Sequence, residues 1–241
     1  MPTESFDPLE VKTISATEMP QKLIFEALMT SVKGGLDQTQ RDYAEDECGR
    51  EIIRHYGKLS QKDPSYGLFT PFDHPSISFK IKADHSTLSQ LILNSTQISF
   101  DLEPLVNVGK NLGHDLVEDE FHVRHPGNYP DSFHHRNPWT EECREEYLAA
   151  SSSAVIEYRQ RNELGMDKAE SLLPMNILQS VTASGNLRSW LRLLDVNSRP
   201  HNSYEMKSLI QAIADEVSKW SPEIYRWWSN NYRSRQDLSL T

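Results

Sequence analysis

One segment restricts the fold of this chain more than any other, the stretch "PSISFKIKAD" at residues 75–84. Apolar side chains at Ile77, Phe79 and Ile81 alternate there with serine and lysine. Successive side chains of a β-strand point to opposite faces, so this pattern is typical of a strand with one face in the core and one in water. The chain therefore contains a sheet whose apolar side other elements must cover.

Strand and helix patterns surround this segment. Residues 9–19 alternate enough to predict an opening strand, and residues 20–35 predict a helix closed by glycines. A second helix is predicted from Asp37 to near Gly57, and a short one over residues 86–95.

The second half of the chain begins with a different composition. Residues 103–138 are rich in Gly, Pro, Asn, Asp and His, which predicts a long irregular loop or insertion. Beyond it the chain reads as mostly helical, including residues 167–179 and 184–205. The sequence thus predicts a single α+β domain over residues 1–241, with a small sheet and several long helices.

Charge narrows the class of ligand. The 241 residues include 25 Lys and Arg against 35 Asp and Glu, which gives a formal net charge of −10. A protein that binds polymeric nucleic acid carries a basic face to neutralise phosphates, so we do not expect that partner. A small-molecule ligand remains possible, because a few arginines in a pocket can make it locally positive although the net charge of the protein is negative.

Hydropathy and cysteine usage indicate the compartment. No apolar run approaches the roughly 20 residues that cross a bilayer, and the start of the chain lacks a basic region followed by an apolar one. We therefore expect no membrane association and no secretory signal. Cys48 and Cys143 are far apart, so the sequence predicts no disulfide framework and favours a cytoplasmic protein.

Polar residues gather at a predicted helix junction, residues 184–205. Leucines at 187, 191 and 194 have the spacing of a core-facing stripe, and Arg188 and Arg192 are four apart on another face. One interpretation is that these arginines are exposed and pair with Asp195 or Glu205. The other is that they face a ligand.

Three groups of residues carry a resemblance that favours the ligand. They are the turn Thr70–His74, then Leu173, Pro174 and Asn176, and finally Asn186, Arg188 and Ser189 with His201 and Glu205. In this order and spacing they resemble the flavin-dependent thymidylate synthases, the ThyX family, over roughly residues 20–105 and 140–230.

The resemblance implies an α+β domain that assembles as a homotetramer, with FAD at the subunit interfaces. Arginine offers a planar, charged donor fork suited to pyrophosphate, and asparagine can donate and accept at once. The residues expected to bind the cofactor are Thr70, Asn94, Ser95, Asn186, Arg188, Arg192 and His201.

The family's signature, Arg-His-Arg followed seven residues later by serine, is not retained at the expected place. Counting without gaps from Phe79 keeps the family's glutamine as Gln90, but puts residues 93–95, Leu-Asn-Ser, at Arg-His-Arg. Glu103 replaces the serine. Three further family arginines correspond to Leu105, Glu170 and Asn197.

A long insertion offers a different register for the signature. It would move the signature to Arg124 and His125, with Ser132 seven residues after the histidine, although Pro126 would then replace the second arginine.

The catalytic candidates are Gln90, Asp101 and Glu103. Asp101 keeps the acidic character of the family's sequence in this region. Residues i and i+2 of a strand share a face, so Asp101 and Glu103 could act as general acid and base. The other interpretation is that both are surface carboxylates.

The lost arginines also bear on the substrate. A carboxylate facing a nucleotide phosphate is repulsive, so the sequence does not favour tight binding or methylation of deoxyuridine monophosphate. We expect a divergent flavoprotein that acts on a pyrimidine nucleotide or a related small molecule. NADPH and methylenetetrahydrofolate are expected only if the family's activity is retained. The alternative is a catalytically inactive relative that serves as a structural or interaction subunit, and the sequence leaves both open.

A cluster of histidines gives a third interpretation. Five of the nine histidines fall within residues 114–135, next to acidic residues, and could hold a metal ion as in a metal-dependent hydrolase. Their spacing matches no closed metal site and no cysteine supports it. We therefore expect solvated loop histidines and no metal.

Overall fold

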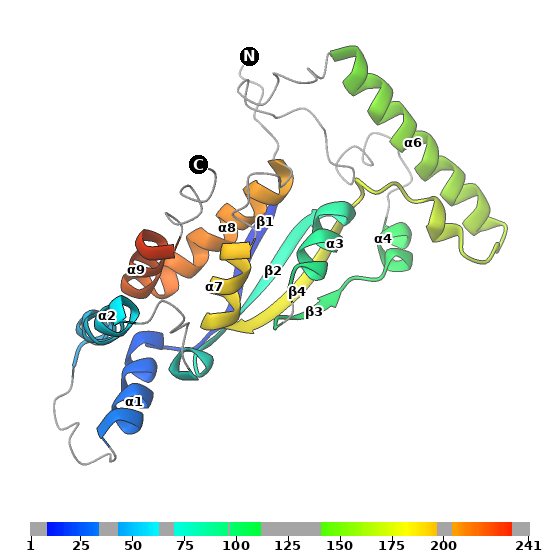
Figure 1. Cartoon of the computed structure of the whole chain (residues 1–241). Helices are drawn as coiled ribbons and strands as arrows, with labels where there is room; N and C mark the ends of the chain where they lie inside the picture. Colours follow the sequence, from blue (N-terminus) through cyan, green and yellow to red (C-terminus); the bar gives the residue numbers. More distant parts are fainter. Residues whose placement is uncertain are drawn as a thin grey trace. The chain divides into compact units, whose positions relative to one another are not determined.

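The computed structural model describes residues 9–33, 43–62, 70–95, 97–111, 141–196 and 204–232. Within them, one four-stranded sheet has the order β1-β2-β4-β3 (Figure 1). Its strands are β1 (Glu10–Ala16), β2 (Ser76–Asp84), β3 (Ser99–Leu102) and β4 (Leu178–Asn186). The longer helices are α1 (Pro20–Lys33), α2 (Glu45–Lys62), α6 (Glu141–Glu163), α8 (Tyr204–Trp220) and α9 (Pro222–Tyr232). The shorter ones are α3 (His85–Leu93), α4 (Leu105–Asn111) and α7 (Leu187–Val196), with 3₁₀ turns at Thr70–Asp73 and Ala169–Leu172.

The two central strands run antiparallel. The backbone N–H of Leu187 donates to Pro75 O at 3.1 Å, and that of His85 donates to Ile177 O at 2.9 Å. The start of β2 therefore lies opposite the end of β4, and the end of β2 opposite the start of β4. In β2 the apolar residues Ile77, Phe79 and Ile81 are fully buried, as the alternation predicted. The predicted α+β fold class is confirmed.

The chain divides into two compact units. The first takes in Leu9, Glu10, Ile81–Leu93 and Asp101–Val181. The second takes in Val11–Lys80, Asn94–Phe100 and the residues from Thr182 onward. That residues 1–241 form a single domain stays a prediction. No helix among the described residues is long and apolar enough to cross a bilayer.

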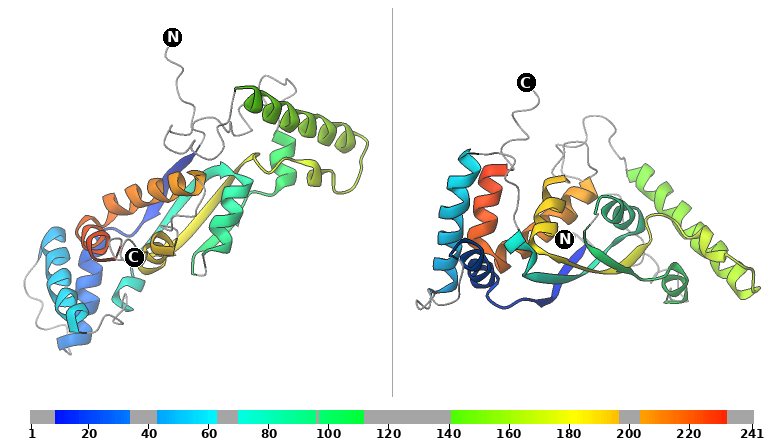
Figure 2. Two further views of the ribbon diagram at one scale, coloured as in Figure 1. Left: turned by 45° about the horizontal axis from the view of Figure 1, so that its top comes forward. Right: turned by 60° about the horizontal axis from the view of Figure 1, so that its bottom comes forward.

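In the second unit, α2 packs against both α1 and α9 (Figure 2). Gln21 of α1 is fully buried and bonds to residues of α2 and α9. The Gln21 amide donates to the Glu223 carboxylate at 2.8 Å and to Glu45 O at 3.2 Å, and its oxygen accepts from the N–H groups of Glu223 and Ile224. A Cβ at Gly49 would lie 2.7 Å from Glu223 Cβ and 2.8 Å from the Gln21 oxygen. The close approach of α2 to α9 therefore requires glycine at this position.

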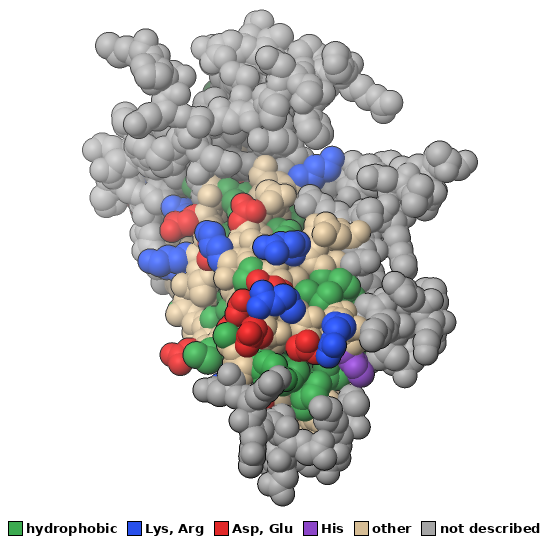
Figure 3. Space-filling model, turned by 90° about the vertical axis from the view of Figure 1, so that its left-hand side faces the viewer, with side chains coloured by type: hydrophobic (Ala, Val, Ile, Leu, Met, Phe, Trp, Pro, Cys, Tyr) green, Lys and Arg blue, Asp and Glu red, His purple; other side chains and the backbone are tan. Residues whose placement is uncertain are grey.

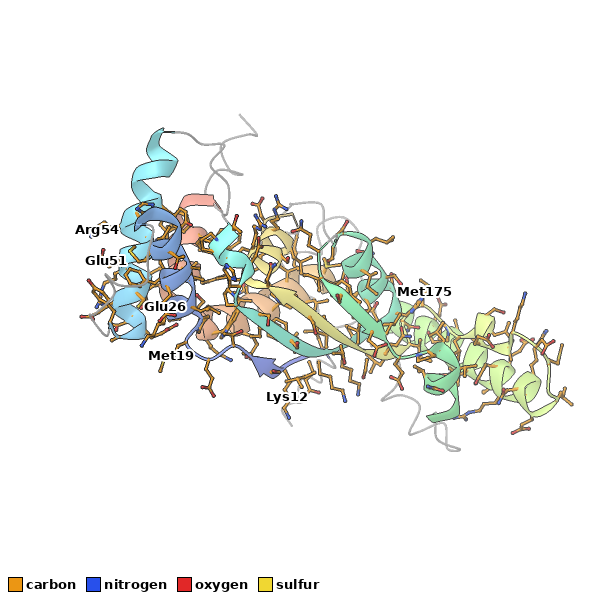
Figure 4. The ribbon with its side chains drawn as sticks, turned by 90° about the horizontal axis from the view of Figure 1, so that it is seen from below. Lys12, Met19, Glu26, Glu51, Arg54 and Met175 are labelled. Atoms are coloured by element: carbon orange, nitrogen blue, oxygen red, sulfur yellow. The ribbon has the colours of Figure 1, made fainter. Side chains whose placement is uncertain are left out.

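The outer side of α2 carries ion pairs. Arg50 pairs with Asp46 at 3.0 Å, and Arg54 contacts Glu51 one turn away (Figure 4). Figure 3 shows basic and acidic side chains next to one another on one face of the molecule. Pairs as exposed as these contribute little to stability.

Two predictions from the sequence are corrected. Residues 167–179 and the start of 184–205 were expected to be helical, but they hold a 3₁₀ turn and strand β4. The buried side chains of Val181 and Ala183 reveal the two-residue period of that strand. In addition, Leu105–Asn111 of the expected irregular region form helix α4. Pro104 opens it, since its carbonyl accepts from the N–H groups of Asn107 and Val108.

The first unit contains a buried tyrosine whose hydroxyl has no hydrogen-bond partner among the described residues. Tyr158 packs with Val108, Val155, Ile177 and other apolar side chains, and is 1% exposed. Burial raises the pKa of the Tyr158 phenol, and the charge of Glu170 adds to the rise, so the hydroxyl stays protonated.

We expect Tyr158→Phe to raise the free energy of unfolding by about 1 kcal/mol. A buried hydroxyl without a partner loses its hydrogen bonds to water on folding and gains none within the protein. Urea denaturation of the two proteins measures the difference. A loss of stability in the variant would show that the hydroxyl has a partner.

Candidate functional site

The 3₁₀ turn Thr70–Asp73 presents a carboxylate to the junction of β4 and α7. Pro71 and Phe72 are buried and anchor the turn. Asp73 Oδ1 accepts from Arg188 Nε at 2.7 Å and from Asn186 Nδ2 at 3.0 Å, and Asp73 Oδ2 contacts Arg188 Nη2. Arg188 and Asp73 thus form a bidentate pair, with side chains 27% and 26% exposed.

Asn186 joins this ion pair to helix α7. Its Oδ1 accepts from the N–H of Ser189 at 2.8 Å and from the Ser189 hydroxyl at 2.7 Å, which caps the first turn of the helix. Its Nδ2 donates to Asp73. The nitrogen and the oxygen of this amide are therefore both hydrogen-bonded within the protein.

A buried tryptophan fixes α7 against the sheet. Trp190 is fully buried, and its ring centroid lies 4.7 Å from that of Phe79 in an edge-on arrangement. Its Nε1–H is shared between Ile77 O and Gly185 O, both at 3.2 Å. A Cβ at Gly185 would lie 3.1 Å from Ile98, so this glycine permits the close approach of the 97–98 segment.

A pocket of about 320 Å³ lies between α7 and residues 94, 95, 97 and 98. Two apolar residues contribute to its lining, and the remaining lining residues are polar or charged. The lining residues are Asn94, Ser95, Gln97, Ile98, Ser189, Arg192, Leu193 and Asp195. Arg192 Nη1 donates to Gln97 Oε1 at 3.2 Å and links the two walls. The charges of Arg192 and Asp195 cancel, so the lining residues carry no net charge.

The structure brings several of the expected cofactor-binding residues together. Asn94, Ser95 and Arg192 line the pocket, although two come from one segment and one from a helix almost a hundred residues later. Asn186 and Arg188 lie on the neighbouring Asp73 network, and Thr70 is exposed at the other end of the same 3₁₀ turn. His201 lies outside the described residues.

The catalytic candidates lie in the first unit. Gln90 is exposed on α3 and Asp101 is exposed on β3, whereas Glu103 follows the end of that strand. Glu103 Oε2 accepts from the N–H of Ser180 at 3.3 Å. Their catalytic role stays a prediction, as does the role of the histidine segment, residues 114–135, all of which lies outside the described residues.

Sequence reasoning missed a second polar network around Glu103. The Gln179 amide donates to Glu103 O, and its oxygen faces His85 Nδ1 at 2.8 Å. Because an amide oxygen only accepts, this contact is a hydrogen bond in the tautomer of His85 that carries its proton on Nδ1. The sequence contains only a weak signal for this network. His85 precedes the predicted helix 86–95, and Gln179 ends the predicted helix 167–179, so nothing placed the two side chains together.

The sheet and helix α7, with the polar pocket beside that helix, belong to an α+β protein. The sequence model of the family described as "Thymidylate synthase complementing protein" matches residues 12–223. The chain belongs to that family.

Individual relatives are distant in sequence, and each matches more than nine-tenths of this chain. A flavin-dependent thymidylate synthase from Halobacterium salinarum is 21% identical, with 95% of this chain and 98% of the relative covered. Crystal structures of the UMP/dUMP methylase PolB from Streptomyces cacaoi share the fold. The form bound with 5-Br dUMP gives a TM-score of 0.68 at 18% identity, covering 93% of this chain and 96% of the other. The form bound with 5-Br UMP gives 0.62 at 17% identity, covering 93% and 95%.

Proposed function

We propose that this protein is a divergent flavoprotein of the flavin-dependent thymidylate synthase type, acting on a pyrimidine nucleotide or a related small molecule. One observation carries the proposal. Three residues expected to bind the cofactor, Asn94, Ser95 and Arg192, meet in one pocket. Membership of the family and the fold shared with the UMP/dUMP methylase support it.

The pocket suits the ring system of a flavin. Its volume of about 320 Å³ is at the lower end of the range for small-molecule sites, so it would hold the ring and not a whole dinucleotide. Ile98 and Leu193 offer apolar surface to the ring, and amide and hydroxyl groups of Asn94, Ser95 and Gln97 suit its hydrogen-bonding edge. When bound, the flavin would supply hydride transfer.

The chain's own residues would hold and orient this group. Arg192, held by Gln97, would close one wall of the pocket, and Asn186 would fix Ser189 at the start of α7. Gln90, Asp101 and Glu103 are proposed to act on the substrate, with the two carboxylates as general acid and base. NADPH and methylenetetrahydrofolate would be needed only if methyl transfer is retained.

A catalytically inactive scaffold is the second candidate. The observation that favours it is the Asp73–Arg188 pair, which commits an arginine fork to a partner inside the protein. Homotetramer assembly and a cytoplasmic location, expected from the family resemblance and from the two distant cysteines, remain proposals under either function.

Reconstitution with FAD separates the two candidates. We expect the purified protein to retain FAD after desalting, with the visible absorbance of a bound flavin. Ser95→Trp should fill the pocket and abolish this retention, while Ser15→Trp, at an exposed position of β1, should not. A protein that stays colourless with excess FAD would overturn the flavoprotein proposal in favour of the scaffold.

Complementation tests the substrate. We expect no growth of a thymidine-requiring strain that expresses this protein, because the register from Phe79 leaves Leu-Asn-Ser in place of Arg-His-Arg. Growth without added thymidine would show that deoxyuridine monophosphate is methylated after all.

A further inference from the structure

Helix α7 carries two arginines with different surroundings. Arg188 and Arg192 are four residues apart, so they lie one turn from each other on the same side of the helix. Arg192 is exposed and lines the pocket, where Asp195 on the same helix balances its charge. A ligand whose ring fills the pocket and whose tail follows α7 toward its N-terminus would meet Arg188 next.

The guanidinium charge of Arg188 is already balanced by Asp73 before any such tail binds. Asp73 accepts from two nitrogens along one edge of the guanidinium, in the geometry that a phosphate would otherwise adopt. Asn186 donates to the same carboxylate at 3.0 Å, and the pair is only about a quarter exposed. Separating Arg188 from Asp73 would therefore be unfavourable, because two charged groups in a partly buried position would lose their partners.

We propose that Asp73 acts as an internal anion that occupies Arg188, so that the site recognises the uncharged ring system of its ligand and gains little from a phosphate. This inference rests on the proposed function and adds a specificity to it. The protein would bind riboflavin and its phosphorylated forms with similar affinity. Three observations support the inference: the bidentate contact, the Asn186 donor on the same carboxylate, and the balanced charge of the described pocket lining.

Riboflavin and FMN form a matched pair of ligands, since they differ by one phosphate. Quenching of flavin fluorescence by the purified protein gives both dissociation constants. For the natural sequence we expect them to agree within about threefold and to change little with added salt, because no net positive charge would face the phosphate.

Asp73→Asn tests the role of the carboxylate directly. The amide keeps the shape and can still accept from Arg188, but it leaves the guanidinium charge unbalanced. We expect FMN to bind about tenfold more tightly than riboflavin to this variant, the scale of one charge-assisted hydrogen bond, and salt to reduce the gain. Adding Arg188→Gln to Asp73→Asn should remove the gain. Asp215→Asn, an exposed site on α8 that changes the net charge equally, should leave the ratio as it was.

The outcomes distinguish a failure of the proposed flavoprotein function from a failure of the inference about Asp73. If neither flavin binds the natural protein, the proposed function and this inference both fall. If both bind and FMN is already preferred tenfold, or if Asp73→Asn leaves the ratio unchanged, only the inference is overturned. Should Asp73→Asn fail to fold, the ratio and the salt series on the natural protein decide alone.

Discussion

Trp190→Ala is expected to lower the free energy of unfolding by about 4 kcal/mol, the typical cost of emptying a fully buried tryptophan site. The indole packs against Phe79, and its N–H serves Ile77 O and Gly185 O. The variant would lose both the packing and the donor for two carbonyls. Since Trp190 holds α7 on the sheet, the pocket should loosen as well. Urea denaturation measures the loss, and FAD titration measures the effect on the pocket.

Trp220→Ala is the matched control for that variant. Trp220 is half-buried, and its indole donates to Thr17 O at 2.9 Å. Because less apolar surface is removed from contact, we expect a loss of about 2 kcal/mol. Equal losses in the two variants would contradict the central place of Trp190 in the core.

Arg188→Ala is expected to weaken FAD binding by about 30-fold, or about 2 kcal/mol, even though Arg188 is not expected to bind the phosphates strongly. Without the guanidinium, the Asp73 charge would stand unbalanced beside the ligand, and Asn186 would lose part of the network that orients it. Arg188→Lys should restore little, because an ammonium cannot form the bidentate contact. Fluorescence titration gives the affinities.

Arg50→Ala controls for the loss of a guanidinium elsewhere. Arg50 pairs with Asp46 on the exposed side of α2, so its removal should leave FAD affinity unchanged. The elution volume in size-exclusion chromatography should be the same for the natural protein and both variants. Unaltered FAD affinity in Arg188→Ala would remove Arg188 from the proposed cofactor site.

Local patterns in the sequence were sufficient for part of the fold. The alternation at Ile77, Phe79 and Ile81 predicted β2, and the leucines at 187 and 191 predicted the buried side of α7. Strand β4 was missed because its outward positions are small and polar while its inward ones include Ala183, so no strong two-residue period is visible. Its strand conformation comes from pairing with β2 in the tertiary structure, which overrides weak local preference.

The candidate site shows the same division. Sequence order and family resemblance pointed to Asn94, Ser95 and Arg192, which the structure brings into one pocket. The partner of Arg188 was expected nearby at Asp195 or Glu205, yet it is Asp73, 115 positions away. Periodicity contains no information about such a pair, because the contact depends on how the turn before β2 meets the end of β4. The role of Gln97 as the partner of Arg192 was missed for the same reason.

A crystal structure of the protein with FAD would test the central claim most directly. We expect the flavin ring in the pocket between α7 and residues 94, 95, 97 and 98, with Arg188 still bonded to Asp73. Flavin density at another place on the chain, or a guanidinium of Arg188 that has left Asp73 for a phosphate, would contradict it.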